Sequence, residues 1–168
     1  MKVLGLDISS KNTGWAVISK GKLKNYGAIP IHLYKNTTRI DNHMLFRYAN
    51  EIKKLMLSIK PTIVAVENVY VGHNDKTAIL LSMMSGVARV IGYGVTKKEI
   101  PTIYPSQVNK FLKIGKPVRA VRKKLVVKGF NQIFNLSLTN KEDDIADAIG
   151  IAYLTYLNLT ANGKLKYI

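Results

Sequence analysis

Two apolar segments of this chain each end on an acidic residue, and no other feature constrains the fold as much. The run VLGLD ends on Asp7 and the run TIVAVE ends on Glu67. Such short apolar runs predict strands buried on both faces, and the carboxyl ends of neighbouring strands in an α/β sheet form the edge where sites lie. A buried carboxylate needs a partner, since an unpaired buried charge is strongly unfavourable. Backbone N–H groups, a basic side chain or a metal ion could fill that role.

The rest of the chain alternates between strand and helix patterns. Strands are predicted at 2–7, 14–19 and 22–29, which would form a meander, and at 62–67 and 99–104. Helices are predicted at 39–60, at 76–92, from Pro105, from Pro117 to Gly129 and at 141–157. The helices follow from apolar residues at helical spacing, bounded by proline and glycine. This order predicts the α/β class with a mixed sheet, in a single domain with its core at about 1–157 and a peripheral tail at 158–168.

A second pair of acids lies on the last predicted helix. Asp144 and Asp147 are three residues apart, so they share one helix face, and the alanines around them would let that face approach a sheet closely. Together with Asp7 and Glu67 they would place four carboxylates in one pocket, which requires cations. Oxygen ligands without cysteine favour Mg²⁺ or Mn²⁺, and two such ions about 4 Å apart can hydrolyse a phosphodiester.

Some of these acids also have simpler explanations. Glu142, Asp143 and Asp144 fall in the first turn of the helix, where negative charge offsets the helix dipole without any metal. We favour that explanation for Glu142 and Asp143. Asp147 lies too deep in the helix for it, and Glu67 could instead form a salt bridge to a lysine.

The overall charge points to a polyanionic partner. The 168 residues contain 26 Lys and Arg against 10 Asp and Glu, a formal net charge of +16. This excess favours a nucleic acid over a surface that is merely well solvated. The chain has no cysteine and no uninterrupted apolar run of membrane-spanning length, and its start meets an acid too early for a secretory signal. We therefore expect a soluble, intracellular protein with no membrane association, in the cytoplasm or at the nucleoid.

The positive charge is concentrated in one segment. Between Lys97 and Lys128 the single acid, Glu99, stands among ten lysines and arginines. In the predicted helix after Pro117, the apolar residues Val118, Val121 and Leu125 share one side. The basic candidates for phosphate contacts in this segment are Lys110, Lys116, Arg119, Arg122, Lys123 and Lys124. A membrane-surface or partner helix is the alternative, but the short length and lack of large aromatic residues favour phosphate binding.

Three motifs together resemble a known family. In chain order, GLDISSKNTGWAVI, VAVENVYVG and DDIADAIGIA resemble the signatures of RuvC-type Holliday junction resolvases, over about residues 3–155. The resemblance implies a ribonuclease H-like fold, with a mixed central β-sheet flanked by helices. It also implies a homodimeric, Mg²⁺-dependent endonuclease that resolves four-way DNA junctions by paired symmetrical nicks.

The resemblance also assigns roles to individual residues. Asp7, Glu67, Asp144 and Asp147 match the family's metal-binding and catalytic acids, although Asp143 could replace Asp144. Tyr70 matches an aromatic that contacts bases near the crossover, and Arg119 falls near a basic DNA contact. At the family's other basic position stands Asn109, so Lys110 takes over that role or the contact is lost.

Three alternatives to this function stay open. An actin-like ATPase also opens on an acid before a turn, but it needs about twice this length and a second phosphate loop. A RuvC-like nuclease acting on RNA, or on forks and flaps, would keep the fold and change the substrate. A non-catalytic junction-binding module would lack one of the acids, and all four are present.

Overall fold

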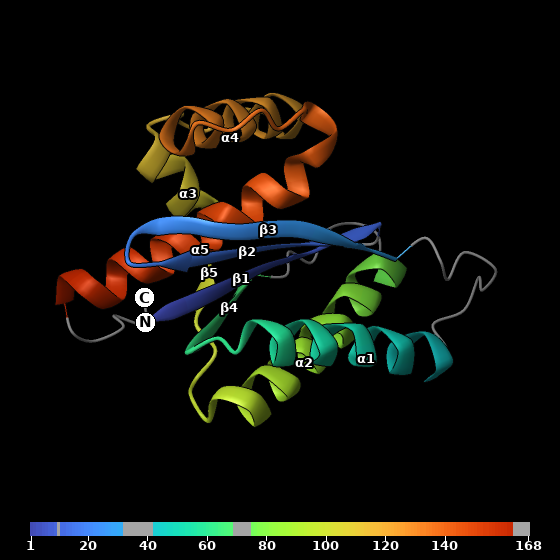
Figure 1. Ribbon diagram of the computed structural model, residues 1–168. Coiled ribbons are helices and arrows are strands. Elements are labelled where there is room, and N and C mark those ends of the chain that lie inside the picture. Colours follow the sequence, from blue (N-terminus) through green and yellow to red (C-terminus); the bar gives the residue numbers. More distant parts are fainter. Residues whose placement is uncertain (10, 32–41, 69–74, 163–168) are drawn as a thin grey trace.

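The computed structural model describes residues 1–9, 11–31, 42–68 and 75–162. Its centre is a five-stranded sheet in the order β3-β2-β1-β4-β5 (Figure 1). The strands are β1 (Lys2–Ile8), β2 (Asn12–Ser19), β3 (Lys22–Pro30), β4 (Ile63–Glu67) and β5 (Thr102–Ile103). The first three strands form the expected antiparallel meander, whereas β4 runs parallel to both β1 and β5. The sheet is therefore mixed, as the sequence predicted.

Helices cover both faces of this sheet (Figure 1). They are α1 (Asn42–Ile59), α2 (Asp75–Thr96), α3 (Pro105–Leu112), α4 (Arg119–Phe134) and α5 (Asp143–Asn162), with a 3₁₀ turn η2 (Asn140–Glu142) before α5. α1 and α2 pack on one face, where Leu4 and Leu6 of β1 meet Tyr48 and Met84. α5 packs on the other face, and α3 and α4 lie over α5. Because strand residues alternate between faces, one central sheet supports two separate cores.

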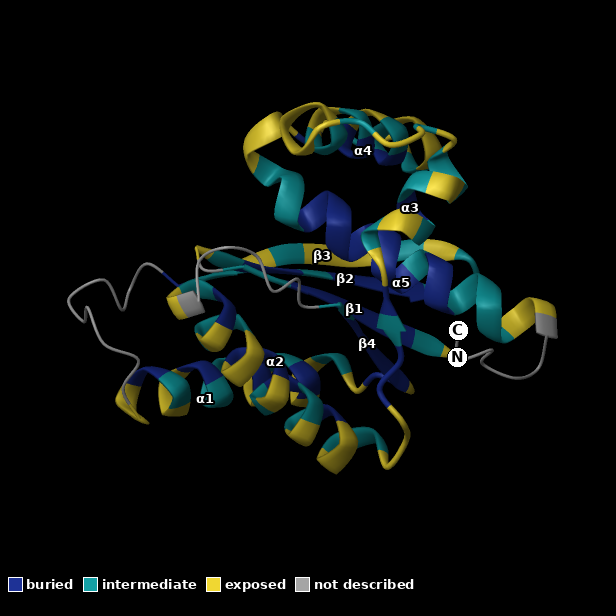
Figure 2. Ribbon diagram, turned by 180° about the vertical axis from the view of Figure 1, so that it is seen from behind, coloured by how far each residue is buried: buried dark blue, intermediate teal, exposed yellow. Residues whose placement is uncertain are grey.

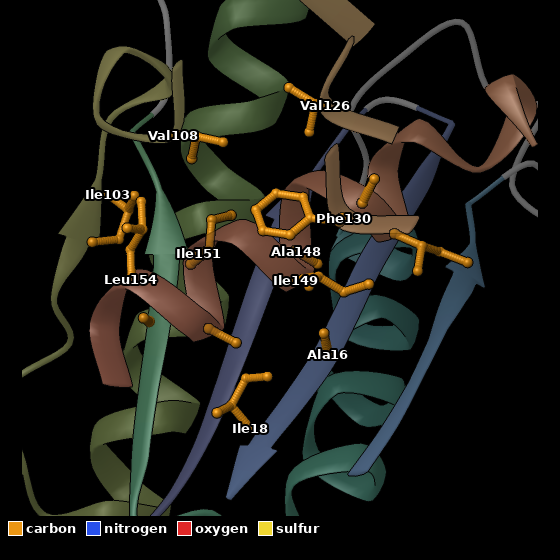
Figure 3. Close-up of a cluster of buried hydrophobic side chains, with 14 of the residues drawn as sticks. Ala16, Ile18, Ile103, Val108, Val126, Phe130, Ala148, Ile149, Ile151 and Leu154 are labelled. Atoms are coloured by element: carbon orange, nitrogen blue, oxygen red, sulfur yellow. The ribbon is translucent and has the colours of Figure 1, made fainter. Parts of the chain in front are cut away.

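The second core joins α4 and α5 to the sheet (Figure 3). Phe130 of α4 is fully buried there, among Val108, Val126 and Ile149. Its ring lies where Gly150 leaves room, since a Cβ on that glycine would come 3.0 Å from the ring. This contact fixes α4 against α5 and thereby fixes the basic segment relative to the acids of α5.

α5 lies unusually close to β1. A side-chain carbon at Gly5 would come within 2.5 Å of the Ala148 carbonyl oxygen and the Ala152 amide nitrogen, so only glycine fits. The small residues predicted to allow a close approach therefore do so, on both the strand and the helix. This packing brings the first turns of α5 to the end of β1.

The structure corrects the prediction for α4. This helix begins at Arg119 rather than Pro117 and runs through Gly129 to Phe134, where Asn135 ends it with a left-handed backbone (φ 53°). Its buried face consists of Val126, Val127 and Phe130, while Val118 and Val121 are 72% and 45% exposed. The side that carries Val118, Val121 and Leu125 is therefore not the side that packs, because Phe130 and its neighbours make the contact with α5. Gly129 instead allows contact with Leu112, whose side chain would lie 2.9 Å from a Cβ there.

Other elements differ mainly in length. Only two residues of the strand predicted at 99–104 pair with β4 in the ladder. α2 continues four residues beyond its predicted end, and α5 continues to Asn162, with Leu159 packed against the core. The first five residues of the predicted tail are therefore helical.

α2 presents a second apolar side to the outside. It is the single helix within the described residues that is long and apolar enough to cross a membrane by length and composition. Its inner side packs in the core through Met84 and Ala88, and Arg89 donates hydrogen bonds to the Ile100 carbonyl and to Thr102 Oγ1. This inner side of α2 is therefore part of the protein core. The outward-facing apolar residues of α2, called the outer stripe of α2 below, are Ile79, Met83, Val90 and Tyr93. Exposed segments of this helix are yellow in Figure 2.

Candidate active site

Asp7 and Glu67 meet at one edge of the sheet. β1 and β4 pair in parallel with Leu6 opposite Val66, so the next residue of each strand is an acid. The Asp7 side chain lies within hydrogen-bonding contact of Glu67 and is only 6% exposed. Burial raises the pKa of Asp7 well above its ordinary value, and the negative charges of Glu67, Asp147 and Asp144 raise it further. No ion pair within the described residues reaches Asp7.

The acids of α5 complete this cluster. Asp144 accepts hydrogen bonds from Ser9 Oγ at 3.3 Å and from Asn12 Nδ2 at 3.4 Å, which tie it to the turn between β1 and β2. Burial raises its pKa, with a further contribution from the charge of Asp143. Asp147 is 6% exposed, and burial raises its pKa to about 6 even though Arg122 opposes the shift. The structure thus brings together the four carboxylates that the sequence singled out.

Two basic residues of α4 close the site from the other side. Arg122 donates to both oxygens of Asp147, at 2.8 Å from Nη2 and 3.2 Å from Nη1, and its Nε donates to Asn109 Oδ1 at 3.0 Å. Burial by itself would lower the pKa of Arg122, but the charge of Asp147, aided by Glu67 and Asp7, raises it. Lys123 forms an ion pair with Asp143. The sequence analysis placed both cations on the DNA-facing surface, and the structure places them against acids.

The acids next to the cluster have other partners. Glu142 forms a capping box with Thr139, whose backbone N–H donates to Glu142 Oε2 at 2.8 Å and lowers its pKa. Glu142 therefore has a local structural role, but as the capping partner of Thr139 in η2 rather than as a charge in the first turn of α5, which begins at Asp143. Asp143 is held by Lys123, whereas Asp144 lies near enough to Asp7 to raise its pKa. Asp144 is therefore better placed than Asp143 to share a ligand with Asp7.

The remaining basic candidates lie at the surface. Lys110, Lys116, Arg119 and Lys124 are all exposed, on α3, on the segment between α3 and α4, and on α4. We refer to these four residues together as the α3–α4 basic surface. Arg119 lies near enough to Lys123 for its charge to act on it. Tyr70 lies outside the described residues.

Sequence reasoning missed three polar residues of the site. Ser9 and Asn12 hold Asp144, and Asn109 orients Arg122. The family resemblance predicts a basic residue at position 109, so it gives Asn109 no role of its own. Hydrogen bonds between residues so far apart in the chain leave no local pattern, so no periodicity or motif identifies them.

The carboxylates of the cluster are chemically suited to bind a hard divalent cation. In the present structure, however, their side chains are not arranged as the ligands of one ion. All four acids offer carboxylate oxygens, the ligands that Mg²⁺ and Mn²⁺ prefer. Within residues 1–9, 11–31, 42–68 and 75–162, however, no three His, Cys, Asp or Glu side chains converge as they must around one ion. Asp147 is engaged by Arg122 through both oxygens, so a fitted cation requires this carboxylate to change partners.

Fold and site together define a nuclease of the ribonuclease H-like class. The model of the family described as "Crossover junction endodeoxyribonuclease RuvC" matches residues 3–155. The chain therefore belongs to the RuvC family, as its three motifs suggested.

Individual relatives agree with this assignment. The chain is 30% identical to the crossover junction endodeoxyribonuclease RuvC of Chlorobaculum parvum, over 91% of this chain and 80% of that protein. It is 29% identical to the RuvC of Carboxydothermus hydrogenoformans, over 95% and 98% of the two chains. Among solved structures, Thermus thermophilus RuvC in complex with a Holliday junction substrate superposes with a TM-score of 0.73 at 17% identity, covering 96% of both chains. The yeast mitochondrial Holliday junction resolvase Ydc2 superposes with a TM-score of 0.58 at 15% identity, covering 90% of this chain and 75% of that one. The two structures establish that the fold is ribonuclease H-like.

Proposed function

We propose that this protein is a structure-selective DNA endonuclease that resolves four-way junctions by paired symmetrical nicks. The observation that supports this best is that Glu67, Asp144 and Asp147 all lie near enough to the buried Asp7 to raise its pKa, in a chain with a net charge of +16. An acidic pocket in a basic protein suits phosphodiester hydrolysis, because the acids hold cations and the basic surface holds the polyanion. Membership of the RuvC family adds the junction as substrate.

The four carboxylates are proposed as ligands of two divalent cations, Mg²⁺ or Mn²⁺. When bound, these ions would supply activation of the attacking water and charge stabilisation at the leaving oxygen. Asp7 and Glu67 would be the shared ligands, since they lie in contact at the ends of β1 and β4. Asp144 is preferred to Asp143 as the third acid, because Lys123 already neutralises Asp143. Ser9 and Asn12 would hold Asp144 in place.

The α3–α4 basic surface is proposed to position the DNA. Lys110, Lys116, Arg119 and Lys124 have exposed side chains on α3, on the segment that follows it and on α4, the helix that carries Arg122, so they are available for phosphate contacts. Such contacts set the register of the strand and read no sequence. Lys123 has a side chain that is 33% exposed, so it can add a phosphate contact while paired with Asp143. Tyr70 stays a predicted base contact.

The outer stripe of α2 supports a homodimer. Val90 is 74% exposed, Tyr93 55%, Ile79 50% and Met83 44%, and a Cβ added at Gly86 among them would point into open space. An apolar stripe along a soluble helix needs a covering partner, and a second copy related by a two-fold axis can cover it with the same stripe. Such a dimer would also supply the two active sites that paired nicking requires. We infer that the protein acts inside the cell, in the compartment that holds its DNA.

The function can be tested with synthetic substrates. A four-way junction labelled on each strand in turn should be nicked at symmetrical positions in Mg²⁺ or Mn²⁺, and left intact in EDTA or Ca²⁺. Asp7→Asn should bind the junction and fail to cut it, whereas the control Glu51→Gln, which removes an exposed acid of α1, should cut normally. Preferred cleavage of RNA, forks or flaps would replace the junction as substrate. Binding without any cleavage would instead make the protein a junction-binding module.

A further inference from the structure

We propose that Arg122 is a gate on Asp147, holding this carboxylate until a divalent cation binds and then turning to a phosphate of the substrate. The inference rests on the proposed function, in which Asp147 is a metal ligand. It concerns a side chain that the sequence analysis assigned to the DNA-facing surface and the structure places inside the site.

Arg122 engages both of the carboxylate oxygens that Asp147 could offer to a cation. Both oxygens of Asp147 accept its hydrogen bonds, at 2.8 and 3.2 Å. The two side chains are only 13% and 8% exposed, so little water competes for these oxygens. A forked guanidinium–carboxylate pair is among the strongest hydrogen-bonded arrangements available to a protein. Asp147 cannot offer both oxygens to a metal ion and to this fork at once.

Arg122 is also held from a second direction. Its Nε donates to Asn109 Oδ1 at 3.0 Å, so α3 and α5 together orient the guanidinium plane. α4 is anchored by its buried residues Val126, Val127 and Phe130, which keep its backbone in place. Release of Asp147 therefore requires only a rotation of the Arg122 side chain, with Asn109 as a remaining contact.

Neighbouring carboxylates also act on the ion pair of Arg122 and Asp147. The charges of Asp7 and Glu67 act on Arg122 in addition to that of its direct partner. In the metal-free protein the guanidinium thus offsets part of the negative charge that the ions would neutralise. Once Asp147 ligates an ion, the guanidinium loses its partner at the rim of the α3–α4 basic surface. A phosphate is then its natural acceptor, because arginine binds phosphate with the same fork.

Two variants and a control test the gate by a property other than activity. Arg122→Gln removes the charge and the fork, and Arg122→Lys keeps the charge without the fork. Lys128→Gln removes one exposed charge from the same helix and controls for the general electrostatic effect. The measurement is the affinity for Mn²⁺, determined by calorimetry on the DNA-free protein, together with melting curves in EDTA and in Mn²⁺.

If Arg122 competes with the cation, Arg122→Gln should bind Mn²⁺ about tenfold more tightly than the wild type, since a hydrogen-bonded competitor to a charged group has gone. Arg122→Lys should show a smaller increase, and Lys128→Gln almost none. Arg122→Gln should also have a lower melting temperature than the wild type in EDTA, and Mn²⁺ should raise its melting temperature by more. If Arg122→Gln does not fold without metal, the Mn²⁺ affinity of Arg122→Lys becomes the deciding measurement.

Unchanged or weaker Mn²⁺ binding in a folded Arg122 variant would overturn the gate and leave Arg122 a structural partner of Asp147. The same titration on Asp7→Asn separates this result from a failure of the proposed function. If Asp7→Asn binds Mn²⁺ as well as the wild type, the carboxylate cluster is not the metal site, and the gate falls with it.

Discussion

Replacing Asp7 by asparagine should stabilise the metal-free protein while abolishing nicking. Asp7 lies 6% exposed beside Glu67, without an ion-pair partner within the described residues, and its pKa is raised by burial and by neighbouring carboxylates. Two unit charges about 4 Å apart repel by about 4 kcal/mol at an effective dielectric constant of 20. Asparagine keeps the shape, removes the charge and can donate a hydrogen bond to Glu67.

The size of the effect has a ceiling. At pH 7 a carboxylate with an ordinary pKa of 3.8 takes up a proton at a cost of about 4 kcal/mol, so the penalty of keeping Asp7 charged cannot exceed that value. We expect Asp7→Asn to raise the free energy of unfolding by about 3 kcal/mol at pH 7. In a chain of this size that corresponds to about 6–12 °C in melting temperature.

The sign of the pH dependence gives the sharper test. Because the folded protein raises the pKa of Asp7, it binds more protons than the unfolded chain between about pH 4 and the raised value, and wild-type stability falls as pH rises through that range. The Asp7→Asn variant has no titrating group at this position, so its stability does not fall for this reason as the pH rises. The two melting temperatures should therefore coincide near pH 4 and separate towards pH 7.

Circular dichroism melts in EDTA at pH 4 to 8, on the wild type, Asp7→Asn and the charge-matched control Glu51→Gln, would measure this. Glu51 is paired with Lys54 on the exposed side of α1, so its variant should follow the wild type. An Asp7→Asn protein that melts earlier at pH 7, or whose advantage does not change with pH, would refute the reasoning. Asp7 would then be a structural partner within the fold.

Further predictions concern binding and assembly. Replacing Lys116, Arg119 and Lys124 by alanine should weaken binding to all junction sequences alike and reduce the log–log salt slope by about 0.9 for each lost phosphate contact, whereas an unchanged slope would place them away from DNA. Tyr70→Ala should slow cleavage and make the cut position less precise, since stacking on an aromatic ring is worth about 1–3 kcal/mol per base. Tyr70→Phe should cut almost normally. Equal damage from both changes would mean that the Tyr70 hydroxyl, and not the ring, makes the important contact. Val90→Asp, on the outer stripe of α2, should yield a monomer in sedimentation that still binds Mn²⁺; a dimer that survives this change uses another surface.

The main features of the site follow from short-range patterns. Asp7 and Glu67 were predictable because each ends an apolar strand, and parallel strands place such ends at one edge. Asp144 and Asp147 were predictable from helical spacing among small residues. The mixed sheet followed from a meander at the start and from alternation of helices and strands afterwards. For the four acids the evidence lies within a single strand or helix, and for the mixed sheet it lies in the order of the elements along the chain.

The features that were missed depend on distant contacts. The ion pair of Arg122 with Asp147 joins residues 25 apart, and nothing local distinguishes Arg122 from its exposed neighbour Arg119. The buried face of α4 does not follow from residues 117–129, because Phe130, beyond the predicted end of the helix, decides it. The strand predicted at 99–104 is shorter because only Thr102 and Ile103 lie opposite β4 in the ladder.

The close approach of α5 to β1 at Gly5 also governs when the enzyme can become active during its own synthesis. Ser9 and Asp144, which bond across this junction, are 135 residues apart in the chain. A ribosome delivers Asp7 and Glu67 before the acids of α5. If all four carboxylates are needed for cutting, as proposed, a nascent chain acquires its basic segment before a complete catalytic centre, and cutting has to wait until α5 has emerged and docked.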